Sequence, residues 1–151
     1  MYASASQLPF NLASFEGRFL PADGTAAPPD REGRWFLCQE QSIFLLAGRQ
    51  GMDCIPFGAI PPGFAGRVEN IVHFGSYLGS PCWAGSVEPG LSPPEGFARE
   101  RLVPGQIQLG DDLLSLCGLA QQATFWEATS WHCPRCGNPT VAIKGERGKR
   151  C

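Results

Sequence analysis

The chain has 151 residues, of which 43% are hydrophobic and 11% aromatic, so it is long enough to bury a core of its own. Lysine and arginine number 12 against 14 aspartate and glutamate, and the net charge of -2 gives no overall sign of a nucleic-acid-binding surface. The N-terminus lacks a signal-peptide pattern and no run of eighteen apolar residues occurs, so neither export nor membrane insertion is expected.

Cysteine usage indicates a reducing compartment. The chain has seven cysteines, an odd number, and four of them lie in apolar stretches without regular spacing: Cys38, Cys54, Cys82 and Cys117. This pattern suits buried thiols better than a disulfide framework. We therefore expect a soluble, cytoplasmic protein.

The first half of the chain predicts a loop followed by a β-hairpin. Three prolines, two glycines and Asp30 lie within residues 21–33, which is the composition of a loop. Two apolar runs follow, at 34–38 and 42–47, and the polar link Gln39-Glu40-Gln41 separates them. Runs of this length joined by a short polar link predict two antiparallel strands.

A second hairpin is predicted from the apolar runs at 71–78 and 82–87. Gly79 lies between them and can supply the positive φ of a tight turn. His73 lies inside the first run without other candidate ligands nearby, so we interpret it as structural. The proline-rich connection at 55–63 suits neither a central strand nor a helix and predicts an ordered surface connection, with a ligand lid as the alternative.

From residue 111 the apolar spacing becomes three and four residues, which predicts an amphipathic helix ending near Ser130. Asp111 is the predicted N-terminal cap, and with Asp112 it would complement the helix dipole. The predicted buried face consists of Leu113, Leu116, Leu119 or Ala120, Ala123 and Trp126. Hairpins that pack with a C-terminal helix predict an α+β domain over residues 1–130, with residues 131–151 as the start of a metal-binding module.

The end of the chain carries the motif most specific for a function. Residues 133–137 form a Cys-x-x-Cys-Gly sequence, and Cys151 follows after fourteen intervening residues. Cys133 and Cys136 can bind one metal ion from a tight turn that Gly137 supports, which is the opening of a zinc ribbon. A second Cys-x-x-Cys should complete the tetrahedron, so we expect the fourth ligand and a further domain beyond residue 151.

Other interpretations of this region stay open. A redox Cys-x-x-Cys needs a helix through its second cysteine, which Pro139 and the polar run at 144–149 disfavour, and the thiols could also be ordinary packing residues. His132 could replace a missing ligand, although its position next to Cys133 favours a flanking role. The basic cluster at 144–150 is interpreted as a solvated hairpin of the ribbon rather than a phosphate contact.

A family pattern is carried by Trp35, 78–84, 97–102, Ala120, Ala123, Trp126 and 131–140. These elements in this order resemble the N-terminal half of the NADH pyrophosphatase family of Nudix hydrolases. The similarity is weak over residues 1–60 and most specific over 97–140. It implies a degenerate Nudix-like domain over 1–130 and then a four-cysteine zinc ribbon, with Cys133, Cys136 and Cys151 in three ligand positions, ahead of a catalytic Nudix domain.

The resemblance also implies a reaction for the parent protein. That family cleaves NAD(H) to nicotinamide mononucleotide and AMP, with Mg²⁺ or Mn²⁺ in the catalytic domain, and RNA with an NAD cap is a substrate by family analogy. No catalytic residue is expected in this chain. The Arg99-Glu100 pair has Val103 and Pro104 where a Nudix box needs further glutamates to hold its metal ions.

Two other classes of function remain as alternatives. One is a zinc-ribbon module that contacts nucleic acid or a protein partner without any catalytic activity. The other is a stand-alone redox or thiol enzyme. A homodimer stays open as an assembly state, and the sequence alone does not identify a nucleotide pocket in the first domain.

Overall fold

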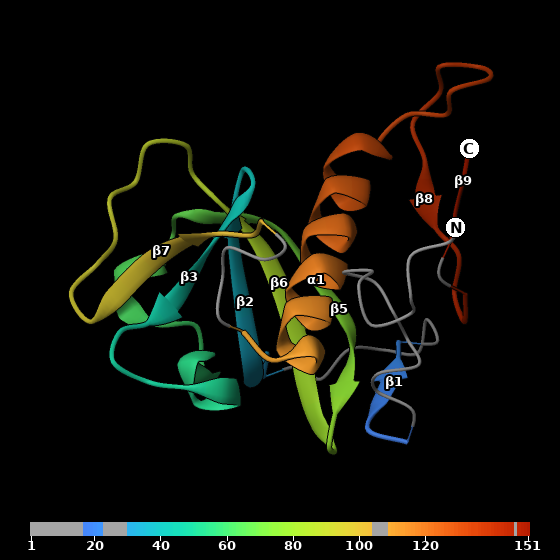
Figure 1. The fold of residues 1–151 in the computed structure, drawn as a ribbon. Coiled ribbons are helices and arrows are strands. Elements are labelled where there is room, and N and C mark those ends of the chain that lie inside the picture. The colour runs from blue at the N-terminus through green and yellow to red at the C-terminus, as the bar shows by residue number, and fades with distance from the viewer. Residues whose placement is uncertain (1–16, 23–29, 104–108, 147) are drawn as a thin grey trace, which may run out of the picture.

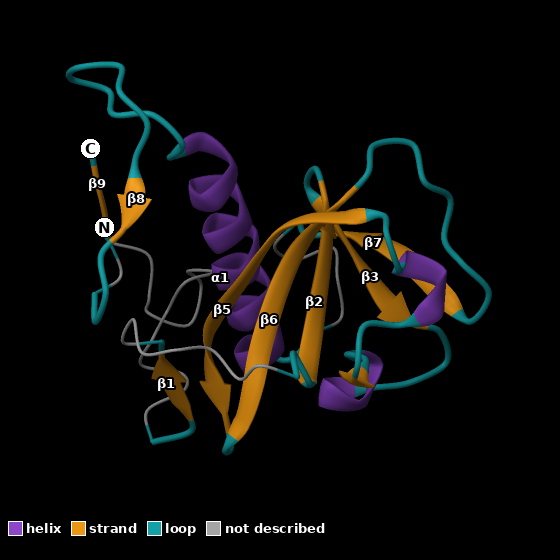
Figure 2. Ribbon diagram, turned by 180° about the vertical axis from the view of Figure 1, so that it is seen from behind, coloured by secondary structure: helices purple, strands orange, loops and turns teal. Residues whose placement is uncertain are grey.

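The computed structural model describes residues 17–22, 30–103, 109–146 and 148–151, and it confirms the predicted α+β class. A seven-stranded sheet carries the helix α1 (Asp111–Thr129) on one face, and a separate two-stranded sheet follows the helix (Figures 1 and 2). The sheet order is β1-β5-β6-β2-β3-β7, with β4 also paired to β2. The strands of this sheet are β1 (Phe19–Pro21), β2 (Gly33–Gln39), β3 (Ser42–Leu46), β4 (Phe57–Gly58), β5 (Val68–Tyr77), β6 (Ser80–Val87) and β7 (Phe97–Arg101).

Both predicted hairpins are confirmed. β2 pairs with β3 and β5 pairs with β6, each antiparallel. The second turn consists of Leu78 and Gly79, with φ of 48° and 80°, so it lies earlier than predicted and Ser80 and Pro81 belong to β6. Two consecutive positive φ values match the twist of the flanking strands. The two hairpins then join through a parallel pairing of β2 with β6, which the sequence pattern did not predict.

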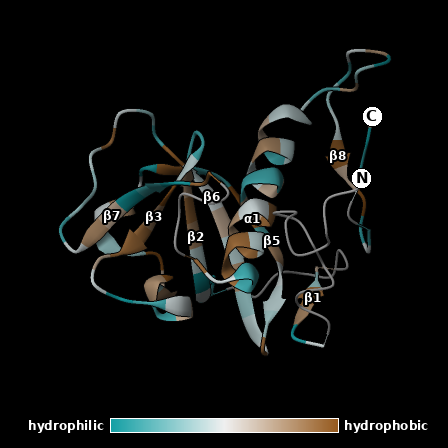
Figure 3. Ribbon diagram, in the orientation of Figure 1, coloured by the Kyte–Doolittle hydropathy of each residue, from teal (hydrophilic) through white to brown (hydrophobic). Residues whose placement is uncertain are grey.

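The central strand β2 is buried on both faces, and its successive side chains alternate between these two faces. Phe36 and Cys38 belong to the apolar cluster under α1, whereas Trp35 and Leu37 belong to a second cluster on the opposite face. Hydrophobic residues accordingly follow one another along β2 and β3 (Figure 3). Trp35 stacks on Trp83 of β6 with ring centroids 5.8 Å apart, which ties the two hairpins together.

The helix packs on β5, β6 and β2, as predicted for an amphipathic segment. Its N-cap is Gly110, not Asp111, and no side chain caps it. Asp112 instead pairs with Arg18 and accepts a hydrogen bond of 3.1 Å from the Tyr77 hydroxyl, so it joins the helix to the sheet. The helix residues buried against the sheet include Leu113, Leu116, Cys117, Ala120 and Ala123.

Trp126 is the main error in the predicted buried face of the helix. Its side chain is 43% exposed, because the buried positions of α1 end at Ala123 and Thr124. The helical spacing of apolar residues therefore continues past the part of α1 that covers the sheet. No helix among the described residues is long and apolar enough to cross a membrane.

The proline-rich connection between the hairpins is only partly a surface segment. It contains the 3-10 turns η3 (Gly51–Cys54) and η4 (Pro62–Phe64), with β4 between them. Ile55 and Phe64 are buried, so this segment contributes to both apolar clusters. Pro21 ends β1 and Gly33 begins β2, so these two residues of the loop predicted at 21–33 lie in strands, and residues 1–16 and 23–29 lie outside the described residues.

Candidate metal centre

The candidate metal centre lies at the C-terminal end of α1, where the chain leaves the helix and folds back on itself. His132 forms an isolated antiparallel bridge with Pro139, and the Thr140 N–H donates to the Trp131 carbonyl at 2.9 Å. The Thr140 hydroxyl donates to the Ser130 carbonyl. These contacts close residues 131–140 into a compact turn, which we call the knuckle.

Inside the knuckle, backbone hydrogen bonds fix the two cysteines of the Cys-x-x-Cys motif. The Cys133 N–H donates to the Asn138 carbonyl, and the Gly137 N–H donates to the Cys133 carbonyl, both at 2.8 Å. Gly137 has φ of 72°, a conformation that costs glycine little and most other residues more. The predicted role of this glycine in the turn is therefore confirmed.

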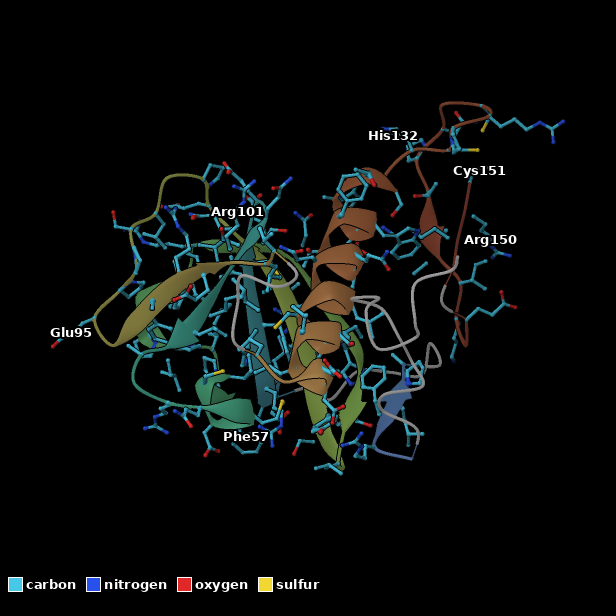
Figure 4. The ribbon with its side chains drawn as sticks, in the orientation of Figure 1. Phe57, Glu95, Arg101, His132, Arg150 and Cys151 are labelled. Atoms are coloured by element: carbon cyan, nitrogen blue, oxygen red, sulfur yellow. The ribbon has the colours of Figure 1, made fainter. Side chains whose placement is uncertain are left out.

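The third cysteine reaches the knuckle through a short hairpin. β8 (Val141–Ala142) pairs antiparallel with β9 (Lys149–Arg150), and Cys151 follows directly. The three sulfur atoms of Cys133, Cys136 and Cys151 lie within 4.8 Å of one another. In Figure 4, Cys151 lies beside the knuckle that contains His132. The structure thus brings together all three residues that the sequence singled out, although fourteen residues separate the second from the third.

The geometry and the chemistry of these three side chains fit a metal ion. Bond lengths of about 2.3 Å to a tetrahedral zinc place neighbouring sulfurs about 3.8 Å apart, which is compatible with the observed cluster. Thiolates are ligands that select zinc over hard cations such as Mg²⁺. The cluster of metal-binding side chains within the described residues contains no histidine, so His132 is a flanking residue here.

The surroundings of the cluster favour the thiolate that a metal requires. Backbone N–H groups of Cys136 and then Arg135 point at the Cys133 sulfur and lower the pKa of this thiol to about 7. The pKa of Cys151 is raised instead, first through its hydrogen bond with the Cys136 thiol and then through Cys133. One thiol therefore ionises easily while its neighbour holds the proton, as expected when several thiols share a small volume without a cation.

Lys149 anchors the returning strand to the helix. Its ammonium lies 4.9 Å from the centroid of the Trp126 ring and 5.0 Å from that of Trp131, and it pairs with Glu127 at 3.1 Å. Only 10% of the Lys149 side chain is exposed. The prediction of a solvated basic hairpin is thus wrong for Lys149, because two aromatic faces and a carboxylate surround its charge.

These contacts lie next to the metal ligands in the sequence. Trp131 precedes Cys133 by two residues, and Lys149 precedes Cys151 by two. The contacts of Lys149 therefore hold both halves of the cysteine cluster against the end of α1. The sequence analysis did not predict these contacts of Lys149. Trp126 near the end of the helix and Trp131 just after it are a signal for them, because two neighbouring tryptophans indicate that a cation or a partner covers their rings.

The other four cysteines form no part of this centre. All four are buried with free thiols, as predicted. Burial raises the pKa of Cys38 and of Cys82 to about 12, and it raises the pKa of Cys117 well above its ordinary value. A buried thiol of this kind is inert toward metals and oxidants compared with the three at the C-terminal end.

Comparisons with known proteins were made for the whole chain. No model of a known protein family matches it, and a search of curated proteins found no match. The interpretation of the chain therefore rests on its own residues and geometry.

Proposed function

We propose that residues 131–151 form the first part of a structural zinc ribbon, and that the chain is the non-catalytic N-terminal region of an NADH pyrophosphatase of the Nudix family. The observation that carries the proposal is the cluster of Cys133, Cys136 and Cys151 on a knuckle and hairpin docked against the helix. Cys133, Cys136 and Cys151 would hold zinc, which would cross-link the knuckle to β9. In this reading the α+β domain and the ribbon position a catalytic domain that cleaves NAD(H) to nicotinamide mononucleotide and AMP.

The order of elements supports this proposal. A sheet with one helix, followed at once by a Cys-x-x-Cys knuckle, is the arrangement that the resemblance implies for the N-terminal half of that family. The three ligands would leave one position of a tetrahedron for a further thiolate. Zinc content measured by mass spectrometry on the purified protein, before and after the paired substitution Cys133→Ser and Cys136→Ser, tests the ribbon. One zinc per chain that the double variant loses is the expected result.

The coding sequence after codon 151 tests the second half of the proposal. A second Cys-x-x-Cys followed by a Nudix box is the expected finding, because the carboxylates of that box would hold Mg²⁺ or Mn²⁺ at the diphosphate. If the ribbon binds zinc but no Nudix box follows, the metal centre stands and the NADH pyrophosphatase assignment is rejected. The two parts of the proposal are thus tested separately.

A second function is favoured by the distribution of charge. Residues 131–151 contain five lysines and arginines and one glutamate, although the whole chain is acidic. Trp131 is 55% exposed within this basic segment, and aromatic faces among basic side chains suit single-stranded nucleic acid. Binding of a labelled oligonucleotide that weakens steeply with salt would favour this binding module, and equal mobility of the oligonucleotide with and without protein would exclude it.

A further inference from the structure

A hollow of about 730 Å³ lies beside β4 and η3, away from the metal centre. Phe57, which lines it, lies at the opposite end of the molecule from Cys151 in Figure 4. We propose that this hollow binds a small phosphate monoester that carries a planar ring, with Arg34 and Arg49 as its phosphate-binding residues. The proposal does not depend on the function proposed above.

The charges that line the hollow favour an anion. Arg34 and Arg49 lie in its wall, and Asp53 is the one acidic residue there. Within the described part of the chain, neither arginine forms an ion pair, and the Arg34 Nε is buried without a hydrogen-bond acceptor. A buried donor without an acceptor costs free energy and calls for an explanation. A site that binds an anion would account for two arginines without a carboxylate partner in one hollow.

The structure holds Arg34 in place without the help of a ligand. Arg34 lies in β2 between two partner strands, where it pairs with Phe57 of β4 and Cys82 of β6. Its guanidinium carbon lies 5.6 Å from the centroid of the Phe57 ring. A guanidinium already fixed by a strand and an aromatic face loses little further entropy on binding, and its planar donors match the oxygens of a phosphate.

The rest of the wall suits a flat apolar group. Most of it is formed by side chains that present apolar faces, among them Met52, Ile55, Pro56, Pro61, Pro62 and Phe97. The volume lies within the range of sites for small molecules, which combine apolar walls with few polar groups. Asp53 can accept hydrogen bonds from sugar hydroxyls, and its charge disfavours a chain of several phosphates. A nucleoside monophosphate therefore fits this hollow better than a triphosphate or a free base.

The test is calorimetric titration of the purified folded chain with AMP, ATP, adenosine and inorganic phosphate. We expect AMP to bind at least tenfold more tightly than each of the other three. Arg49→Gln should weaken AMP binding at least tenfold, and because Arg49 is exposed on a loop this variant should fold normally. Arg31→Gln, an exposed arginine outside the hollow, is the matched control and should bind AMP as the unaltered chain does.

A second variant shows whether the loss of AMP binding in Arg49→Gln comes from the binding site or only from a change in the loop that contains Arg49. Arg34→Gln should also weaken AMP binding at least tenfold while circular dichroism shows an unchanged fold. No measurable AMP binding by the unaltered chain would overturn the proposal. So would equal losses in Arg31→Gln and Arg49→Gln, or phosphate binding as tight as that of AMP, which would indicate an adventitious ion only. Zinc content is measured in the same samples, so that failure of this site is distinguishable from failure of the metal centre.

Discussion

At the scale of single residues, seven cysteines divide into two chemically distinct groups. Cys38, Cys54, Cys82 and Cys117 are buried, whereas Cys136 and Cys151 are exposed and Cys133 is half-buried. The thiolate is the reactive form of cysteine, so its reactivity follows pKa and access. The same residue type therefore serves as a small apolar core side chain in the first group and as a candidate metal ligand in the second.

This division predicts the outcome of thiol labelling. In the metal-free folded protein, an aromatic disulfide reagent should modify three thiols per chain quickly and four only after denaturation, because burial raises the pKa of the latter. One equivalent of zinc should protect the three fast thiols. Mass spectrometry of the labelled peptides identifies the residues. Rapid labelling of Cys38 or Cys117 in folded protein would contradict the core that we describe.

The same buried thiols predict a loss of stability at high pH. Burial raises the pKa of Cys38 from its ordinary value of 9.0 to about 12. Between these two values the unfolded chain releases a proton that the folded chain keeps, so the free energy of unfolding should fall as pH rises from about 9 to 12. The slope is up to about 1.4 kcal/mol per pH unit for each such thiol. Below pH 9 this contribution is constant.

Urea denaturation at several pH values measures this effect. Cys38→Ala removes one titrating group, so the slope of stability against pH above pH 9 should become shallower in this variant even if its stability at pH 7 is lower. Val87→Ala is the control, since it removes a buried apolar side chain that carries no titrating group and should leave the slope unchanged. Identical slopes in all three proteins would show that Cys38 does not titrate as described.

At the scale of elements, Lys149 connects the β8–β9 hairpin to α1. The contacts with Trp126, Trp131 and Glu127 should contribute about 1 kcal/mol, which corresponds to roughly fivefold in a binding constant. Because Cys151 follows two residues later, Lys149→Met should weaken zinc binding by about this factor although it removes no ligand. Lys144→Met, at an exposed position of the same hairpin, should have no effect.

Cobalt substitution provides the measurement, because thiolate-to-cobalt absorption reports the ligand set directly. Competition with a chelator gives the affinity, and the spectrum shows whether the three sulfurs still bind. Weaker cobalt binding with an unchanged spectrum is the result expected for Lys149→Met. Equal affinity in the Lys149 and Lys144 variants would mean that contact with the helix does not position the ligands.

The elements also show what could be predicted from the sequence and what could not. The two hairpins were predictable because each pairs strands that a short turn joins, so the turn residues and the apolar runs suffice. The parallel pairing of β2 with β6 depends on residues about fifty positions apart, such as Trp35 and Trp83, and no local pattern records it. The order of the strands across the sheet could not be predicted from the sequence for the same reason.

The candidate site shows the same contrast. Cys133 and Cys136 were predictable because metal binding imposes a short spacing on them. The contacts of Lys149 were not predictable. The amphipathic spacing places Trp126 on the face of the helix that packs on the sheet, and it does not show that the sheet ends before this residue and leaves Trp126 open to Lys149. The prediction of Asp111 as the cap was wrong because Gly110 takes the N-cap position. Asp112 instead contacts Arg18 and Tyr77.

At the scale of the whole molecule, the described residues bring no carboxylates together in a group of three or more side chains that could hold a metal ion. Glu100 lies on the edge strand β7, and Asp112 is occupied by Arg18 and Tyr77 at the start of α1. We predict that this chain with NADH and Mg²⁺ or Mn²⁺ releases nicotinamide mononucleotide at the rate of a blank reaction. Chromatography of the products measures it. Release above the blank that copurifies with the chain, and that Glu100→Gln abolishes, would require a catalytic centre that we have not described.

The apolar clusters and the metal centre share no residue, and this separation predicts how the molecule responds to loss of zinc. Every buried side chain of both clusters lies at or before Ala123, so the sheet and most of α1 do not need the ribbon for their core. Chelation should leave the far-ultraviolet circular dichroism nearly unchanged. Among the described residues, the side-chain contacts that join the β8–β9 hairpin to α1 are those of Lys149, worth about 1 kcal/mol, so the melting temperature should fall by only about 2–4 °C. Restoring zinc should reverse the shift, and in Lys149→Met chelation should shift the melting temperature less. A cooperative loss of helix and sheet on chelation would mean that the ribbon belongs to the same folding unit as the core, contrary to the packing observed.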